Sequence, residues 1–267
     1  DISDDISLVT GDTLNKDFLR RTLTDYQPDV IVHMAALPLA NVAIEQTEEA
    51  FDSILSSTVN ILEVVRDFNH ECPVVYTSSS MVYGDFQTQS VTENATKDPK
   101  DIYGSIKLAG EIISSGYRKR YGIDVRTVRP TAVYGPYDGN QRVLYKFITQ
   151  ALQGKSLQID GDGSMALDFT YVEDTANGIY RVATLKVAKG ETFNIARGKS
   201  QTLSAAVSII REFIDDVRVE YREVPDHIPN RGTLDITKAK NLLGFQPQFG
   251  LEEGLPTYIE HLRNNPI

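Results

Sequence analysis

The sequence predicts an α/β fold built around a doubly wound parallel sheet. Short apolar runs typical of buried strands, such as Val74-Val75-Tyr76, alternate with longer segments of helical periodicity, such as residues 103–120. The strand at residue 74 leads directly into Thr77-Ser78-Ser79-Ser80. Small hydroxyl residues in that place lie at the carboxyl edge of the sheet, where folds of this class bind ligands. We therefore expect the functional site at that edge.

The rest of the chain shows the same alternation. Further strands are predicted at residues 6–9, 30–32, 123–128, 157–159, 193–195 and 217–224, and further helices at residues 14–23, 48–68, 203–213 and 251–262. His33 follows the strand at residues 30–32, and we expect it to be a core histidine rather than a ligand.

Tyr103 and Lys107 are the strongest candidates for chemistry. They are four residues apart in a predicted helix, so both side chains lie on one helix face. An ammonium beside a phenol stabilises the phenolate and lowers a pKa that starts near ~10, which makes Tyr103 an acid/base group at neutral pH. Alone, the pair would more simply be a solvated pair on a helix surface. The serines that end the preceding strand favour catalysis.

Ser79 and the Tyr103-Gly-Ser-Ile-Lys107 motif, with Val82-Tyr83-Gly84 between them, resemble the extended short-chain dehydrogenase/reductases. More narrowly, the chain resembles the NAD-dependent epimerase/dehydratase family of nucleotide-sugar enzymes. Further motifs follow in the family's order: Arg129-Pro130, Val133-Tyr134-Gly135-Pro136, Gly161-Asp162-Gly163, Asp168-Phe169-Thr170-Tyr171-Val172-Glu173-Asp174 and Leu243-Gly244-Phe245-Gln246-Pro247. The resemblance implies a Rossmann-type sheet with a smaller C-terminal α/β substrate lobe, NAD as cofactor with NADP not excluded, and hydride chemistry at a sugar carbinol.

The resemblance also assigns roles to residues. It implies that Tyr103 exchanges a proton with a sugar hydroxyl, that Lys107 lowers the Tyr pKa and holds the cofactor ribose, and that Ser79 hydrogen-bonds the reacting oxygen. The cofactor-binding residues implied are Asp12, Thr13, Met34, Ala35, Ala36, Leu37, Tyr103, Lys107 and Thr131. The substrate-binding residues implied are Ser79, Ser80, Arg142 and Arg231.

Alternatives stay open for three of these residues. Asp12 could instead close an Asx turn after the first strand. Arg142 shares a predicted helix face with Lys146, and a solvated face is the commoner explanation for two such cations. Arg231 could be an ordinary arginine of a surface loop.

Three positions depart from the family pattern. Ile54 stands where members often have Asn, which removes one expected hydrogen bond to the cofactor. Ala132 and Leu167 replace an Asn and an Arg that touch the substrate diphosphate in relatives. One charge-assisted contact is worth about 1.5 to 3 kcal/mol, so either Arg231 or Arg142 compensates or the substrate carries no nucleotide.

The family's glycine-rich pyrophosphate turn and the strand that selects NAD or NADP do not occur in the sequence, so the first β-α-β unit is absent from the chain as given. We expect the native polypeptide to carry about 45 to 60 further N-terminal residues with that unit. We place the NAD(P)-binding domain at residues 1–135 plus about 168–196. The substrate lobe is placed at about 136–167 plus 197–267.

Composition excludes several classes of function. A formal net charge of −10 argues against nucleic acid or an anionic membrane as partner, because both require basic surface. The chain contains no apolar stretch of the ~18 residues that a membrane span needs. No metal site is expected, since four His and one Cys are scattered without ligand spacing. The lone Cys72 excludes an internal disulfide, and we expect a cytoplasmic protein. The resemblance implies a homodimer.

We therefore expect epimerisation of a nucleotide sugar through a transient keto intermediate. Dehydration ranks lower, because Ser80-Met81 stands where dehydratases usually carry Asp-Glu. The alternative enzyme is an NAD(P)-dependent dehydrogenase or reductase of a free sugar, sugar acid or other small carbonyl compound, which the residues at 132 and 167 favour. A non-catalytic cofactor-binding module ranks last, since such modules usually lose the Tyr or the Lys.

Overall fold

The computed structural model describes residues 6–37, 45–68, 71–226 and 228–265. At its centre four parallel strands lie in the order β1-β2-β4-β9, which confirms the predicted parallel α/β sheet. Their bounds are β1 (Ile31–His33), β2 (Val74–Thr77), β4 (Val125–Pro130) and β9 (Thr192–Ile195).

Helices cover both faces of this sheet. Side chains alternate between the faces along each strand, so a strand of apolar residues needs a packing partner on each face. Val74 and Tyr76 of β2 lie in an apolar cluster with α1 (Lys16–Tyr26), α4 (Ser57–Phe68) and α5 (Ile102–Tyr121). Val75 lies in the opposite cluster, with α7 (Val172–Thr184) and α9 (Thr237–Leu243). The sheet is therefore doubly wound. A short helix α3 (Thr47–Phe51) and a π-helical turn (Asp52–Ser56) lead into α4.

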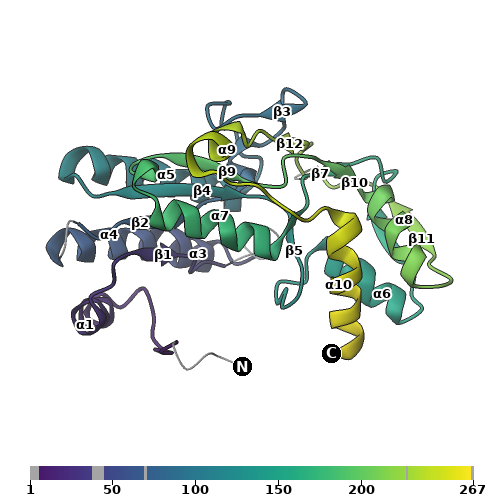
Figure 1. The fold of residues 1–267 in the computed structure, drawn as a ribbon, viewed down its shortest axis with the longest axis horizontal. Coiled ribbons are helices and arrows are strands. Elements are labelled where there is room, and N and C mark those ends of the chain that lie inside the picture. Colours follow the sequence, from purple (N-terminus) through teal and green to yellow (C-terminus); the bar gives the residue numbers. More distant parts are fainter. Residues whose placement is uncertain (1–5, 38–44, 69–70, 227, 266–267) are drawn as a thin grey trace.

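A third apolar cluster joins three helices. These helices lie to one side of the sheet (Figure 1). These are α6 (Val143–Leu152), α8 (Leu203–Phe213) and α10 (Leu251–Asn264). Two small sheets complete this lobe: β6 (Leu157–Asp160) pairs with β11 (Val219–Arg222), and β7 (Ala166–Leu167) pairs with β10 (Gln201–Thr202). The sequence predicts that residues 234–245 belong to the lobe, yet buried side chains there pack in the cluster of the sheet.

The remaining elements are short. They are β3 (Ser90–Val91) paired with β12 (Thr233–Leu234), β5 (Val133–Tyr134) paired with β8 (Thr170–Tyr171), and 3-10 turns at Ser80–Tyr83 and Lys186–Ala188. Within the described ranges, no helix has the length and apolar character needed to cross a bilayer.

The predicted strand at residues 6–9 is wrong. That segment has no regular structure, and Ile6 and Leu8 are 60% and 78% exposed. A strand needs a neighbour for its backbone hydrogen bonds, and within the described part of the chain β1 pairs only with β2.

Candidate active site

Ser79, Tyr103 and Lys107 come together where β2 meets α5. The Lys107 ammonium donates to the carbonyl oxygen of Thr77, the last residue of β2, at 2.7 Å. The Ser79 side chain lies close enough to the Tyr103 phenol to lower its pKa. The hydroxyl of Tyr76 donates to the Lys107 carbonyl at 3.1 Å and ties the helix to the strand. The geometry expected from the sequence is therefore present, while the catalytic roles stay a proposal.

Local sequence explains why the helix comes so close. Asp101 caps the start of α5 by accepting a hydrogen bond from the Gly104 N–H at 2.6 Å. A side chain at position 104 would place its Cβ 2.8 Å from the Met81 carbonyl oxygen, and one at Gly110 would lie 2.2 Å from the Tyr76 hydroxyl oxygen. Both glycines thus let α5 lie directly against the strand and the 3-10 turn that follows it.

Ser79 is held by the turn that it starts. Its hydroxyl accepts from the Met81 N–H at 3.2 Å, so Ser79 caps the turn Ser80–Tyr83. Ser80, the other serine expected to contact substrate, is only 1% exposed. Ser79 is also buried, which keeps its hydroxyl in a fixed place.

The electrostatics of the pair differ from the sequence expectation. Burial raises the pKa of Tyr103 to about 12, while Arg142 and the hydrogen bond from Ser79 act to lower it. Burial lowers the pKa of Lys107 to about 8. The Lys107 Nζ lies 5.7 Å from the centre of the Tyr103 ring and donates to the strand carbonyl. The lowering of the Tyr103 pKa that we expect of Lys107 stays a prediction.

Arg142 lies near Tyr103, and Arg231 lies near Asp101 at the start of α5. Arg142 directly precedes α6, and its charge lowers the pKa of Tyr103. Its guanidinium donates to Asp138 at 2.8 Å. Burial lowers the pKa of Arg231 to about 10, which the nearby Asp101 opposes. The Arg231 Nε is buried and has no hydrogen-bond partner in the part of the chain that is described. Arg231 is thus no ordinary surface arginine, since buried donors normally have partners.

Asp12 forms the Asx turn that was the alternative to adenine binding. Its carboxylate accepts from the Leu14 N–H at 2.9 Å. Asn60 of α4 donates to the Thr13 carbonyl at 3.2 Å and anchors the loop. The contact of Asp12 with adenine stays a prediction.

The residues that follow β1 lie next to Tyr103. Ala36 and Leu37 pack with Ile54, Ile106 and Tyr103 in one apolar cluster. Ile54 is completely buried there, which explains an apolar residue where relatives carry Asn. Met34 is 61% exposed, and Met34, Ala35 and Thr13 line a hollow of about 340 Å³ that runs along β1.

His33 is buried as predicted. Its Nε2 lies 3.0 Å from the Thr58 hydroxyl, and burial lowers its pKa to about 4, so the ring is neutral. In the described ranges no group of His, Cys, Asp or Glu is placed to hold a metal ion.

The chain offers groups that fit a nicotinamide cofactor at this edge. The Thr77 hydroxyl is buried and lacks a partner among the described residues. Lys107 makes one hydrogen bond there and has further N–H groups to donate. Ala35 and Ala36 present no bulky side chain.

Leu167 and Ala132, which depart from the family pattern, lie in surroundings that the structure defines. Leu167 is 5% exposed and packs in the core of the lobe. Thr131 is buried directly after β4, and Ala132 follows it with φ of 39°, in the left-handed region that favours Gly and Asn. Neither Ala132 nor Leu167 carries a polar side chain, so neither can bind a diphosphate as the family's Asn and Arg do.

Sequence reasoning missed the ion pair between Arg129 and Glu111, whose side chains are only 4% and 11% exposed. The Arg129 Nε and Nη2 donate to the two carboxylate oxygens of Glu111 at 2.8 and 2.6 Å. Ser78 donates to the same carboxylate at 2.5 Å. The sequence did contain a signal, because Glu111 falls four residues after Lys107 and eight after Tyr103, on the same helix face.

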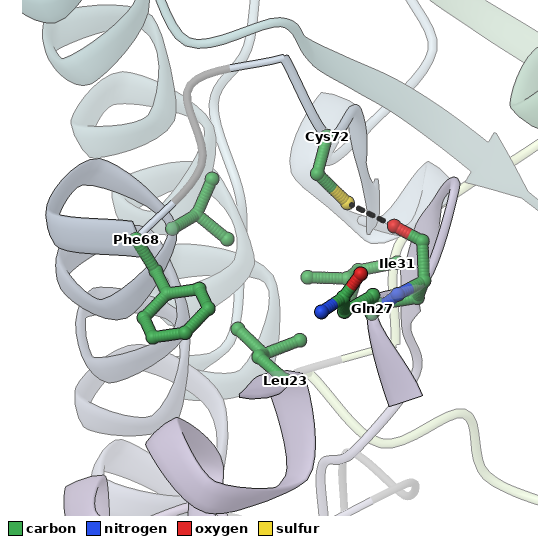
Figure 2. A pocket seen from close by; sticks show the side chains of 7 residues that line it. Leu23, Gln27, Ile31, Phe68 and Cys72 are labelled. Atoms are coloured by element: carbon green, nitrogen blue, oxygen red, sulfur yellow. Dashed lines mark hydrogen bonds between the residues drawn. The ribbon is translucent and has the colours of Figure 1, made fainter. Parts of the chain in front are cut away.

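A smaller hollow of about 140 Å³ lies at the amino ends of the strands (Figure 2). Leu23, Ile31 and Phe68 give it apolar walls, and the Cys72 thiol donates to the Pro28 carbonyl at 3.3 Å. Cys72 is therefore structural here. Since ligands of this fold bind at the carboxyl ends of the strands, this hollow is not the candidate active site.

A doubly wound parallel sheet with Ser, Tyr and Lys gathered at its carboxyl edge defines the class of the extended short-chain dehydrogenase/reductases. Within that class, the chain matches the model of the NAD dependent epimerase/dehydratase family over residues 1–196. The chain belongs to this family.

Individual relatives agree. A UDP-glucuronate 4-epimerase of Thermodesulfobacterium geofontis is 30% identical over 257 residues, which cover 95% of this chain and 78% of that protein. A UDP-glucose 4-epimerase of Mycolicibacterium smegmatis is 30% identical over 274 residues, covering 98% and 84%. The crystal structure of a Bacillus cereus UDP-glucuronic acid 4-epimerase with UDP-glucuronic acid and NAD has a TM-score of 0.89 at 27% identity, covering 96% of this chain and 81% of that one.

Proposed function

We propose that this protein is an NAD-dependent 4-epimerase of a UDP-sugar. The observation that carries the proposal is the meeting of Ser79, Tyr103 and Lys107 at the carboxyl edge of the sheet. Relatives named as 4-epimerases of UDP-glucuronate and UDP-glucose, and a similar structure that holds NAD, supply the substrate class and the cofactor.

Each residue has a defined task in this reaction. Tyr103 takes the proton of the sugar hydroxyl, and it returns a proton when the keto sugar is reduced on its other face. Burial disfavours the phenolate that this step requires, and the positive charge of bound NAD would favour it. Ser79 donates a hydrogen bond to the reacting oxygen. Lys107 binds the cofactor ribose with its remaining N–H groups. NAD, when bound, accepts the hydride and gives it back, so no net oxidation results.

Arg142 makes an anionic sugar the favoured substrate. Its guanidinium, which pairs with Asp138 at 2.8 Å, also lowers the pKa of the Tyr103 phenol, and this supports a cation close to the reacting sugar. An arginine pairs well with a carboxylate, so UDP-glucuronate should be preferred over UDP-glucose. Arg231, with its unpartnered Nε, is then available for the diphosphate.

The direct test incubates NAD-loaded protein with UDP-glucuronate or UDP-glucose and follows the C4 epimer by NMR. Arg142→Gln should lower kcat/KM for UDP-glucuronate by about 10- to 100-fold, the value of one charge-assisted contact, and should change UDP-glucose much less. Lys146→Gln, at an exposed position of α6, is the matched control. Failure of both sugars to epimerise would overturn the proposal.

One observation favours a second function. Leu167 lies in the core of the lobe, and Ala132 carries no polar group, so two diphosphate contacts of the family are missing. A dehydrogenase of a free sugar or sugar acid would not need them. That enzyme would accumulate NADH with a free sugar, whereas an epimerase would not.

We also propose a homodimer and a cytoplasmic location. Sedimentation of the purified protein and fractionation of cells that express it at natural levels test these two points. The division into a cofactor domain and a substrate lobe likewise stays a proposal, with the packing of residues 234–245 against the sheet as its exception.

A further inference from the structure

Three consecutive residues at the end of β2 each contact a different turn of α5. The Ser79 side chain lies close enough to Tyr103 to lower the pKa of its phenol, and the Thr77 carbonyl accepts from Lys107 at 2.7 Å. Ser78, between them, donates to the Glu111 carboxylate at 2.5 Å. The three partners on α5 are spaced by four residues, so they form one stripe along the helix. The segment that carries Ser79 is thus hydrogen-bonded at two points to the helix that carries Tyr103, on either side of the place where Ser79 lies close to Tyr103.

Glu111 does not make its contact alone. Arg129, at the end of β4, binds both of its carboxylate oxygens in a bidentate pair, which fixes the plane of the carboxylate. The side chains of Arg129 and Glu111 are only 4% and 11% exposed. Arg129 also donates to the Tyr83 hydroxyl at 2.7 Å and to the Glu93 carbonyl at 2.9 Å, so its guanidinium is itself held on the far side.

A buried ion pair is weak support for stability, because the cost of desolvating both charges offsets most of their attraction. What such a pair contributes is orientation, because two parallel N–H···O bonds hold the carboxylate in one plane and direction. In this protein the carboxylate held in that orientation accepts the hydrogen bond of Ser78, the residue next to Ser79. A small displacement of a group at the reacting centre can cost about 10²-fold in rate.

We propose that Glu111 and Arg129 are positioning residues of the active site, which act through the Ser78 hydroxyl to hold Ser79 against Tyr103. This inference rests on the proposed function. It assigns no contact with substrate or cofactor to either residue. Their effect on turnover passes entirely through the bond between Ser78 and Glu111.

Ser78→Ala is the cleanest variant, because Glu111 keeps both bonds to Arg129 and the fold loses one hydroxyl. Ser114→Ala is the matched control: Ser114 lies on the buried face of α5, is 2% exposed like Ser78, and its hydroxyl has no partner among the described residues. In NAD-loaded protein, Ser78→Ala should lower kcat for the UDP-sugar by about 10- to 100-fold with KM within about twofold. Ser114→Ala should leave both unchanged.

Glu111→Gln removes the charge at constant size and provides a second route. If both changes act on the same contact, the double variant Ser78→Ala/Glu111→Gln should turn over no more slowly than Glu111→Gln alone. Equal kcat for Ser78→Ala, Ser114→Ala and wild type, each corrected for the folded fraction, would overturn the inference. So would independent, multiplicative losses in the double variant.

A readout without substrate separates this inference from the proposed function. The pKa of Tyr103 is followed by NMR of protein labelled at tyrosine Cζ, with Tyr103→Phe identifying the signal. Arg142, Asp101 and Ser79 all affect the pKa of this phenol, and of the three only Ser79 adjoins Ser78 in the chain. Ser78→Ala should therefore raise the pKa of Tyr103, and Ser114→Ala should not. An unmoved Tyr103 signal would contradict the positioning role even if no UDP-sugar is turned over.

Discussion

The ammonium of Lys107 donates to the carbonyl oxygen of Thr77 at 2.7 Å and lies 5.7 Å from the ring centre of Tyr103. Lys107 thus ties α5 to the end of β2, and it is a buried cation whose hydrogen bond within the described chain is to a neutral group. Burial accordingly lowers its pKa from 10.5 to about 8.

This burial predicts a pH dependence of stability. Between about pH 8 and 10.5 the unfolded chain binds the Lys107 proton more tightly than the folded one, so the free energy of unfolding should rise with pH. Lys107→Met lacks this contribution. Denaturant unfolding at pH 7.0 and at higher pH should show wild type gaining on the variant by roughly 1.4 kcal/mol per pKa unit of the shift. Lys119→Met, at an exposed position, is the control, and parallel curves for wild type and Lys107→Met would contradict the burial.

Leu167→Arg restores the family's residue, but the structure predicts that it damages the fold. The side chain is 5% exposed in the core of the lobe, so a guanidinium there would be buried without a partner. We expect a loss of about 3 to 5 kcal/mol in the free energy of unfolding. Leu167→Met should cost less than about 1.5 kcal/mol. Unchanged stability with tighter UDP-sugar binding would place position 167 at the diphosphate instead.

The backbone conformation of Ala132 predicts that Asn at this position stabilises the fold. Its φ of 39° is unfavourable for an L-residue with a Cβ, and Asn tolerates this region best after Gly. Ala132→Asn should raise the free energy of unfolding by up to about 1 kcal/mol. Ala95→Asn, at a loop position outside that region, should give no gain, and equal effects of both changes would argue against backbone strain.

Arg231→Ala should weaken substrate binding without weakening the fold. Its Nε has no partner in the described chain, so truncation removes a buried cation rather than a network. The KM for a UDP-sugar should rise by about 10- to 100-fold, while a substrate without nucleotide should be unaffected. Arg222→Ala, exposed on β11, is the control. An unchanged KM would remove Arg231 from the diphosphate site.

Much of this architecture could be predicted because the signals are local. The strand at Val74 and the helix after Tyr103 follow from hydrophobic periodicity, and the spacing of Tyr103 and Lys107 places them on one face. The strand expected at residues 6–9 depends on a partner far away in the chain, which periodicity cannot supply.

The site was predicted less completely than the fold. The hydrogen bond from the Lys107 ammonium to the Thr77 carbonyl was not predicted, because it forms only when α5 packs closely against β2. Glu111 and Arg129 were missed because a charged residue in a helix or at a strand end is ordinary until its partner is known. Ion pairs between distant segments are set by tertiary packing, and no spacing rule within one element reveals them.

Tyr103→Phe tests the central claim most directly. The substitution removes one hydroxyl from a half-buried side chain, so the fold and NAD affinity should stay close to wild type. Epimerisation of the preferred UDP-sugar, followed by NMR at C4, should fall by about 10²- to 10⁴-fold, the usual value of a positioned acid/base group. Turnover within a few fold of wild type, by a variant that still binds NAD, would contradict the assignment of Tyr103 as the acid/base residue.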